Sequence, residues 1–223
     1  MRVVVFGATG GLGQWTLKAA MASGHEVVAF ARSPDKLGPM PASAQVEVFQ
    51  GDVTNPDAVR TASEGCEVAI NCTSPAGGNS TLELAQAIVG QASADVLAFY
   101  MVGGLGALWA PGTERQVLVQ DWDDAEALGQ SGLSGSMPRE VIRNMTRGHL
   151  QSMAWMAARG VPHTFLCPGR MIDAGPSEGR RVSLDELGEG RVTEVHMGDV
   201  AQTIVDDLPR GALLGHRVCI LSQ

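Results

Sequence analysis

The chain has 223 residues, of which 44% are hydrophobic and 18% are charged, so it is long enough to bury a sizeable core. Its 16 Lys and Arg against 24 Asp and Glu give a formal net charge of −8, which argues against a nucleic-acid-binding surface of clustered basic residues. No apolar run is as long as a membrane span, and Met1-Arg2 leads directly into Val3-Val4-Val5 without a signal-peptide pattern. We therefore expect a cytoplasmic protein without membrane or nucleic-acid partners.

The cysteine pattern indicates neither a disulfide scaffold nor a metal site. Cys66, Cys72, Cys167 and Cys219 are far apart and show no CxxC spacing. Three of them lie in apolar, strand-like runs, where cysteine usually acts as a small buried hydrophobic residue. We expect no bound metal.

Apolar, β-branched runs alternate with helical patterns along the whole chain. Strands are predicted at residues 2–6, 26–31, 46–50, 68–72, 96–102, 163–167 and 217–221. Helices are predicted at residues 13–23, 56–64, 80–92, 138–159 and 197–208. Runs such as Val3-Val4-Val5-Phe6 are apolar on successive residues, which is typical of parallel strands covered on both faces. The pattern predicts one α/β domain over residues 1–223, with a doubly wound, mainly parallel sheet and helices on both faces.

Gly7, Gly10 and Gly13 form a G-x-x-G-x-x-G pattern between the first predicted strand and the first helix. In this context Gly7 permits a tight turn, Gly10 lets backbone N–H groups approach a pyrophosphate, and Gly13 lets helix and strand pack closely. The helix N-terminus then faces the negative charge. No Gly-Lys-Ser/Thr follows, which argues against a Walker-type nucleoside triphosphatase. The stretch predicts a dinucleotide site.

The end of the second predicted strand indicates which dinucleotide is bound. NAD sites place Asp or Glu there to accept hydrogen bonds from the ribose 2′-OH. Here the sequence is Phe30-Ala31-Arg32-Ser33, with a guanidinium that can hold a 2′-phosphate through paired charged hydrogen bonds. We expect NADP(H) rather than NAD(H); the alternative is that Arg32 is a solvated loop cation.

The ends of the next two predicted strands carry further polar residues. Asp52 follows the third strand, where its carboxylate either meets the adenine amino group or forms a helix-entry turn before Pro56. Cys72, Thr73 and Ser74 follow the fourth strand, beside the expected path of the cofactor.

Two regions interrupt the alternation of strands and helices. Residues 103–137 are rich in Gly, Trp and acids, and residues 170–195 contain GPSEGRR and LGEGR. Both follow strand C-termini, where open α/β sheets bind ligands, so we interpret them as insertions that cover the substrate. Solubilising insertions are the alternative.

The chain resembles the atypical short-chain dehydrogenase/reductase group, whose members are similar to the nitrogen-metabolite regulators and to biliverdin-IX-beta/flavin reductase. The motifs that carry the resemblance are FGATGGLG, ARSPDKL, GDVTNPDAV, VGGLGAL, ARGVPHTFLCPGRM and GDVAQTIVDDL, which together span nearly the whole chain. The resemblance implies a Rossmann-type domain with a small C-terminal substrate-covering region. It also implies NADPH in an extended groove and hydride transfer to a small-molecule substrate.

The resemblance also assigns cofactor contacts by position. It assigns the phosphates to Gly7, Thr9, Gly10, Gly11, Leu12 and Gly13, the 2′-phosphate to Arg32 and Ser33, the adenine to Asp52 and Val53, the ribose to Cys72, Thr73 and Ser74, the back of the nicotinamide to Met101 and Val102, and the far side to Pro168, Gly169 and Met171.

The proton-donating residues of ordinary short-chain reductases are missing. Those enzymes use Tyr-x-x-x-Lys on one helix, where the i,i+4 spacing brings both side chains to one face. This chain has one tyrosine, Tyr100, in the fifth predicted strand, and the matching helical positions hold Met145 and His149. Met145 cannot transfer a proton. The tyrosine-dependent mechanism is therefore absent.

His149 is the remaining candidate for a catalytic residue. At the position of the Lys it could hydrogen-bond the nicotinamide ribose or donate a proton with a pKa near neutral, although a structural histidine is the alternative. Arg143 and Arg147 could face an anionic substrate or pair with surface acids. Met145 and Trp109 are further candidates for substrate contact.

These observations leave three hypotheses. The first is an NADPH-dependent reductase whose acceptor, such as a flavin, a quinone or another conjugated compound, needs no protein proton donor. The second is a non-catalytic NADP(H) sensor or regulatory protein. The third, an epimerase-like enzyme acting on a sugar nucleotide, is less favoured because such enzymes also depend on the tyrosine. The pattern is compatible with a monomer or a homodimer.

Overall fold

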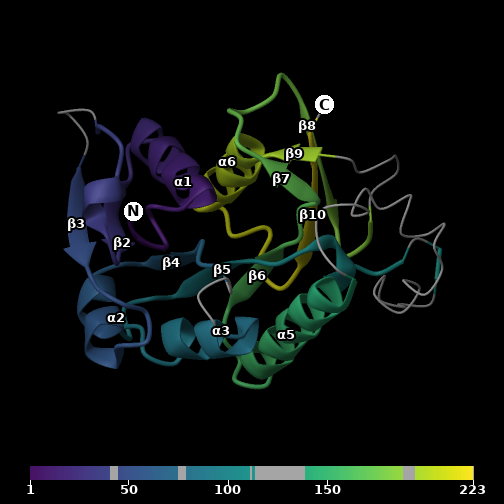
Figure 1. Ribbon diagram of the computed structural model, residues 1–223, viewed down its shortest axis with the longest axis horizontal. Helices are drawn as coiled ribbons and strands as arrows, with labels where there is room; N and C mark the ends of the chain where they lie inside the picture. The colour runs from purple at the N-terminus through teal and green to yellow at the C-terminus, as the bar shows by residue number, and fades with distance from the viewer. Residues whose placement is uncertain (41–44, 75–78, 111, 114–138, 188–193, 223) are drawn as a thin grey trace.

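A computed structural model describes residues 1–40, 45–74, 79–110, 112–113, 139–187 and 194–222 (Figure 1). Its centre is an eight-stranded sheet with the strand order β3-β2-β1-β4-β5-β6-β10-β8. The strands of this sheet are β1 (Arg2–Phe6), β2 (Glu26–Ala31), β3 (Val46–Gln50), β4 (Val68–Asn71), β5 (Ala98–Val102), β6 (His163–Leu166), β8 (Arg180–Leu184) and β10 (Arg217–Ser222). All neighbouring strands pair in parallel except β10 and β8, which pair antiparallel.

Strand β1 lies between β2 and β4, at the point where the strand order of the sheet reverses. It pairs with β2 on one side, with Val4 opposite Val28, and with β4 on the other side, with Val4 opposite Ala69. Val3, Val4 and Val5 are fully buried, as expected for a strand covered on both faces. Because the strand order reverses between β1 and β4, a crevice forms at the carboxyl ends of these two neighbouring strands.

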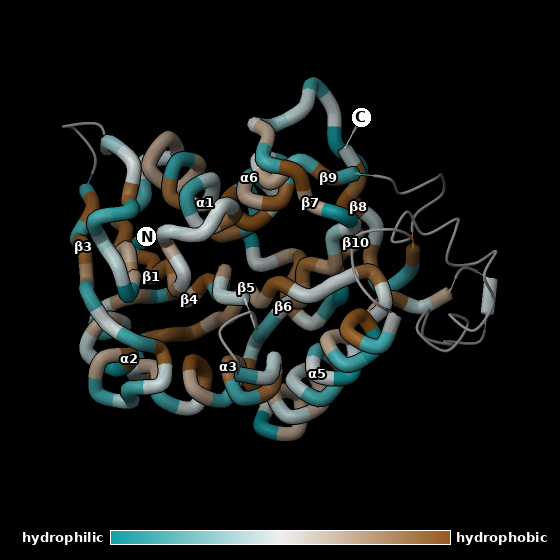
Figure 2. Tube along the Cα trace, viewed as in Figure 1, coloured by the Kyte–Doolittle hydropathy of each residue, from teal (hydrophilic) through white to brown (hydrophobic). Residues whose placement is uncertain are grey.

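Helices cover both faces of the sheet. One face carries α1 (Gly11–Ala22) and α6 (Met197–Asp207), which pack against each other, and the other carries α2 (Pro56–Ser63), α3 (Thr81–Val89) and α5 (Arg139–Ala157) (Figure 1). Figure 2 shows apolar residues along the strands and the sheet-facing sides of the helices. The predicted doubly wound, mainly parallel Rossmann-type fold is confirmed.

The seven predicted strands and five predicted helices are all present, with small differences at their ends. Strand β5 begins at Ala98 rather than at residue 96, because Leu97 is 67% exposed and lies outside the core. Helix α1 begins at Gly11, two residues before the predicted start. Helix α3 ends at Val89, since Gly90 caps it, whereas the prediction extended it to residue 92. Such shifts are ordinary at element ends.

The segment 170–195, interpreted from the sequence as a substrate-covering insertion, contains strands that were not predicted. It contains β8, which extends the central sheet, and two short strands, β7 (Arg170–Ile172) and β9 (Glu194–His196), which form a separate parallel pair. In the other predicted insertion, the 3-10 helix η3 (Leu105–Ala107) is buried. Residues 114–138 lie outside the described part of the chain.

Candidate functional site

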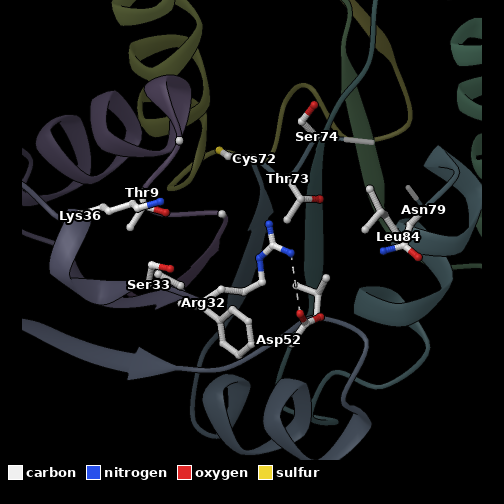
Figure 3. A pocket seen from close by; sticks show the side chains of 15 residues that line it. Thr9, Arg32, Ser33, Lys36, Asp52, Cys72, Thr73, Ser74, Asn79 and Leu84 are labelled. Atoms are coloured by element: carbon white, nitrogen blue, oxygen red, sulfur yellow. Dashed lines mark ion pairs between the residues drawn. The ribbon is translucent and has the colours of Figure 1, made fainter. Parts of the chain in front are cut away.

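A cavity of about 360 Å³ lies at the carboxyl ends of β1, β2, β3 and β4 (Figure 3). This volume is within the range of small-molecule sites. Ten residues that the sequence predicts as cofactor contacts line it together: Gly7, Thr9, Gly10, Arg32, Ser33, Asp52, Val53, Cys72, Thr73 and Ser74. Five further lining residues were not predicted: Phe30, Ala31, Lys36, Asn79 and Leu84.

Two glycines of the loop, Gly7 and Gly13, lie in close contact with the backbone of other residues. Gly7 has φ +81°, and a Cβ there would lie 2.9 Å from the carbonyl carbon of Cys72 and the backbone nitrogen of Thr73. A Cβ on Gly13 would overlap the carbonyl oxygen of Gly7. Only glycine fits at either position, so the strand, the turn and the helix pack as closely as the sequence predicted.

The N-terminus of α1 is suited to an anion. The helix begins after Gly10, whose backbone is extended, and its first turn carries no acidic side chain. The orphan N–H groups and the positive end of the helix dipole therefore face the region of Gly10 without a competing carboxylate. This arrangement can hold the phosphates of a dinucleotide.

The end of β4 presents an oriented hydroxyl to the cavity. Asn71 is buried, and its Oδ1 accepts hydrogen bonds from the backbone nitrogen of Thr73 at 2.9 Å and from its hydroxyl at 2.6 Å. Because the Thr73 hydroxyl donates to Asn71, its lone pairs remain for a donor such as a ribose hydroxyl. The neighbouring Cys72 thiol stays protonated, since burial raises its pKa to about 11.

Cationic and hydroxyl side chains gather where β2 ends. Arg32 and Ser33 follow the strand directly, and the 3-10 helix η1 (Pro34–Lys36) comes next, with Lys36 N donating to Ser33 O at 3.1 Å. This backbone hydrogen bond turns the chain back on itself, and both Ser33 and Lys36 line the cavity. Lys36 was not among the predicted contacts, although its spacing in Ser33-Pro34-Asp35-Lys36 carried the signal.

Asp52 forms the helix-entry turn that the sequence offered as one alternative, and it also lines the cavity. Its Oδ1 accepts hydrogen bonds from the backbone nitrogen and the hydroxyl of Thr54, at 2.9 and 2.8 Å, which makes it a turn residue. Its side chain also lines the cavity, where Oδ2 lies 4.0 Å from Nη1 of Arg32. The two Thr54 hydrogen bonds, with a contribution from Arg32, lower the pKa of the Asp52 carboxyl, so it is ionised at neutral pH.

Three predicted residues of the glycine loop do not line the cavity. The Leu12 side chain is buried in the core, and Gly13 packs on Gly7. Met197, the first residue of α6, lies over Gly11, where a Cβ would be 2.9 Å from its Sδ. Leu12 and Gly13 therefore offer only backbone groups at the helix N-terminus, and Met197 is a neighbour that the sequence did not indicate.

The residues predicted around a nicotinamide lie at the carboxyl ends of β5 and β6, outside the cavity. Met101 is 2% exposed and Val102 is half-buried, with Met101 opposite Phe165 in the sheet. Pro168 is buried, and Gly169 and Met171 are partly exposed. These residues continue the same edge of the sheet away from Cys72 and Thr73.

His149 lies beneath the chain that follows β5. Its imidazole is 5% exposed, its ring meets Phe165 edge-on at a centroid distance of 6.4 Å, and a Cβ on Gly103 would lie 3.6 Å from its Cγ. Nδ1 is buried and has no hydrogen-bond partner among the residues that the structure describes. Burial lowers the pKa of His149 to about 4, so the expected near-neutral pKa is wrong and the imidazole is neutral at pH 7.

The four predicted substrate contacts are dispersed. Met145 and Arg143 are half-buried on α5, and Arg147 on the same helix is exposed. Trp109 lies near the β8 edge of the sheet, where Arg217 stacks on its ring at 3.8 Å and its backbone nitrogen donates to Asp185 O at 2.8 Å. None of the four lines the cavity described above.

Comparison with known proteins agrees with this geometry. A dinucleotide-binding Rossmann domain is the class that the sheet, the glycine loop and the cavity define. The NAD(P)H-binding family profile matches residues 7–209, and the chain therefore belongs to this family. A nicotinamide cofactor follows from that membership. No curated protein matches the chain by sequence.

Solved structures share the fold at low sequence identity. A Bacteroides thetaiotaomicron protein, provisionally named an epimerase, has a TM-score of 0.76 and 23% identity, over 99% of this chain and 96% of that one. A Streptococcus pneumoniae protein, provisionally named an NADH-flavin reductase, has a TM-score of 0.74 and 18% identity over 100% of both chains. An anaerobilin reductase from Escherichia coli O157:H7 has a TM-score of 0.71 and 21% identity, over 100% of this chain and 97% of that one.

The described part of the chain contains neither a membrane-spanning helix nor a cluster of metal-ligating side chains. Among the residues that the structure describes, no helix is long and apolar enough to cross a bilayer. Within the same ranges, no group of three or more His, Cys, Asp or Glu side chains is arranged to hold a metal ion.

Proposed function

We propose that this protein is an NADPH-dependent reductase that transfers hydride to a small conjugated acceptor, such as a flavin or a quinone, without a protein proton donor. The observation that carries the proposal is the combination of a well-formed dinucleotide cavity with the lack of a proton-donating tyrosine.

The preference for NADP over NAD rests on the end of β2. Arg32, Ser33 and Lys36 line one cavity, and the positions directly after β2 carry no carboxylate. A phosphate with about two negative charges is favoured beside two cations and a hydroxyl, whereas the neutral 2′-OH of NAD offers these cations no charge of its own. Lys36 adds a second positive charge beside Arg32 and Ser33, the two residues predicted to hold the 2′-phosphate.

The other lining residues suit the rest of the cofactor. The N-terminus of α1 and Thr9 would hold the pyrophosphate, Asp52 and Val53 the adenine, and Thr73 a ribose hydroxyl. Bound nicotinamide supplies the hydride. Met101, Val102 and Pro168 would form the floor under it at the carboxyl ends of β5 and β6.

The titratable groups near that end of the sheet support an acceptor that needs no acid catalysis. Tyr100 is 1% exposed and its hydroxyl is bonded to Asp207, so it cannot reach a substrate. Met145 carries no exchangeable proton. The imidazole of His149 is neutral because burial lowers its pKa to about 4, which makes it a poor proton donor at neutral pH. An acceptor that delocalises the added charge can take its proton from water.

The names of two structural neighbours point in the same direction. Both the NADH-flavin reductase and the anaerobilin reductase act, by name, on conjugated acceptors. Because the identities are 18% and 21%, this support is an analogy of fold, and the residues named above carry the proposal.

Charge reversal at Arg32 tests the choice of cofactor. Arg32→Glu should weaken NADPH binding by at least about tenfold and leave NADH binding within about twofold, because only NADPH carries the 2′-phosphate. Arg159→Glu is the matched control, since Arg159 is exposed and stacks on Trp155 outside the cavity. Equal losses for both cofactors in the Arg32 variant would remove the argument for NADP.

The second candidate is a non-catalytic NADP(H) sensor, which the missing tyrosine also favours. A sensor would bind NADPH with the same preference, would not oxidise it in the presence of any acceptor, and would bind a partner protein in a manner that depends on the redox state of the cofactor. Turnover with any acceptor would therefore decide for the reductase.

A further inference from the structure

The side chain of Arg32 is turned toward Asp52 rather than toward the neighbouring cation and hydroxyl. Figure 3 shows its guanidinium extending across the cavity between Thr73 and Asp52, with Ser33 and Lys36 on the other side of it in the view. Nη1 of Arg32 lies 4.0 Å from Oδ2 of Asp52, and the two side chains are 72% and 44% exposed. The pair is therefore an ion pair at the cavity mouth that water and ligands can reach.

Asp52 is held in place for this contact. Its Oδ1 accepts two hydrogen bonds from Thr54, at 2.9 Å from the backbone nitrogen and at 2.8 Å from the hydroxyl. With Oδ1 fixed by Thr54, Oδ2 is the oxygen that faces Arg32. The carboxylate is thus oriented by the turn after β3 whether or not Arg32 is present.

We propose that Asp52 is a specificity-determining residue that competes with the 2′-phosphate of the cofactor for the guanidinium of Arg32. The inference rests on the proposed NADPH function. A guanidinium that turns toward a phosphate beside Ser33 and Lys36 must leave Oδ2 of Asp52, so part of the favourable phosphate interaction is offset by the lost ion pair. NADH has no 2′-phosphate and leaves the pair intact.

The competition lowers the preference for NADPH by a modest factor. An exposed ion pair such as Arg32–Asp52 contributes only a small free energy. Its loss on NADPH binding corresponds to a change of about three- to fivefold in the Kd for NADPH. The effect is confined to NADPH, because only its phosphate recruits Arg32. Asp52 acts on the phosphate through Arg32 and is in this sense a positioning residue.

Asp52→Asn isolates this effect, because the amide oxygen still accepts from Thr54 while the negative charge is removed. Titrations of NADPH and NADH, followed by cofactor fluorescence, should show the ratio of NADPH affinity to NADH affinity rising about three- to fivefold in Asp52→Asn, because a changed adenine contact affects both cofactors alike. In the Arg32→Gln background, Asp52→Asn should give no gain for NADPH. This dependence of the Asp52→Asn effect on the presence of Arg32 would not be seen if Asp52 had only a structural role.

Asp57→Asn is the control for a general charge effect, since Asp57 lies nearby on α2 and pairs with Arg60. An equal gain for NADPH in this control, or a gain for Asp52→Asn that persists without Arg32, would overturn the inference. A ratio of NADPH affinity to NADH affinity that is unchanged or lower in Asp52→Asn would overturn it as well. If wild-type protein bound NADPH no better than NADH, the proposed choice of cofactor would fail instead, which separates the two claims.

Discussion

The hydroxyl of Tyr100 donates a 2.7 Å hydrogen bond to Oδ2 of Asp207 in the protein interior. Tyr100 lies on β5 and Asp207 is the last residue of α6, so the bond joins the sheet to the helix end. Asp207 also accepts hydrogen bonds from the backbone nitrogens of Ala212 and Leu213, at 2.9 and 3.1 Å. The one tyrosine of the chain thus has a structural role, and burial and Asp207 raise its pKa.

Tyr100→Phe should lower the free energy of unfolding by about 1–2 kcal/mol, because Asp207 loses one buried hydrogen bond but keeps its two backbone donors. Urea denaturation measures this loss. NADPH affinity and the rate of any NADPH oxidation should remain within about twofold of wild type. A large loss of turnover at unchanged stability would instead identify Tyr100 as a catalytic residue.

The buried imidazole of His149 predicts a specific dependence of stability on pH. Its pKa is lowered from 6.5 to about 4 in the folded protein, so between these values the unfolded chain binds a proton that the folded protein does not. The free energy of unfolding should therefore fall as the pH drops from about 6.5 to about 4. Part of this slope should disappear in His149→Phe, which fills the site with an apolar ring of similar size.

Proton NMR of the His149 ring provides a direct measurement. Its Cε1 proton should shift with a midpoint near pH 4, the value to which burial lowers its pKa. A midpoint near 6.5 would restore His149 as a proton donor and would contradict the proposed mechanism.

Two glycines of the loop should respond differently to alanine. A Cβ on Gly13 would overlap backbone atoms of Gly7, so Gly13→Ala should destabilise the fold by about 2–3 kcal/mol. A Cβ on Gly10 would lie 3.3 Å from the Gly7 carbonyl oxygen, and Gly10 has a φ of −71° and lines the cavity. Gly10→Ala should therefore cost less stability than Gly13→Ala and should weaken NADPH binding. Equal stability of both variants in urea would show that the loop does not depend on the close approach of Gly13.

Lys36 should contribute to NADPH binding alone. Lys36→Ala removes a cation that lines the cavity and should weaken NADPH binding by about three- to tenfold, with NADH unaffected. Lys18→Ala is the control, because the Lys18 ammonium lies over the Trp15 ring, 4.2 Å from its centroid, and Lys18 does not line this cavity. Similar effects of the two substitutions on NADPH would exclude a specific phosphate contact by Lys36.

The sequence predicted the central sheet because its strands are apolar on successive residues. Val3-Val4-Val5-Phe6 has no polar face, and such a run is stable only between two layers of helices. The three strands that the prediction missed lack this signal. β7 and β9 have three residues each and depend on each other for pairing, and Val182 and Leu184 of β8 are 42% and 43% exposed. Tertiary contacts, not local pattern, make these segments strands.

The candidate site likewise contains some residues that the sequence predicted and others that only the tertiary structure brings there. The glycine spacing and Arg32 were readable because they follow predicted strands directly and each role requires a particular residue type. Lys36 reaches the cavity only through the turn of η1, and Met197 lies over Gly11 only because α6 packs on α1. The neutral state of His149 follows from burial beneath Gly103, which a position in the sequence does not reveal.

Oxidation of NADPH, followed as absorbance at 340 nm, tests the central claim most directly. Purified protein should bind NADPH saturably, leave it reduced when no acceptor is present, and oxidise it when a flavin, a quinone or a linear tetrapyrrole is added. The rate with NADPH should exceed that with NADH at equal concentration. Saturable NADPH binding without oxidation by any acceptor of the panel would contradict the reductase and favour the sensor.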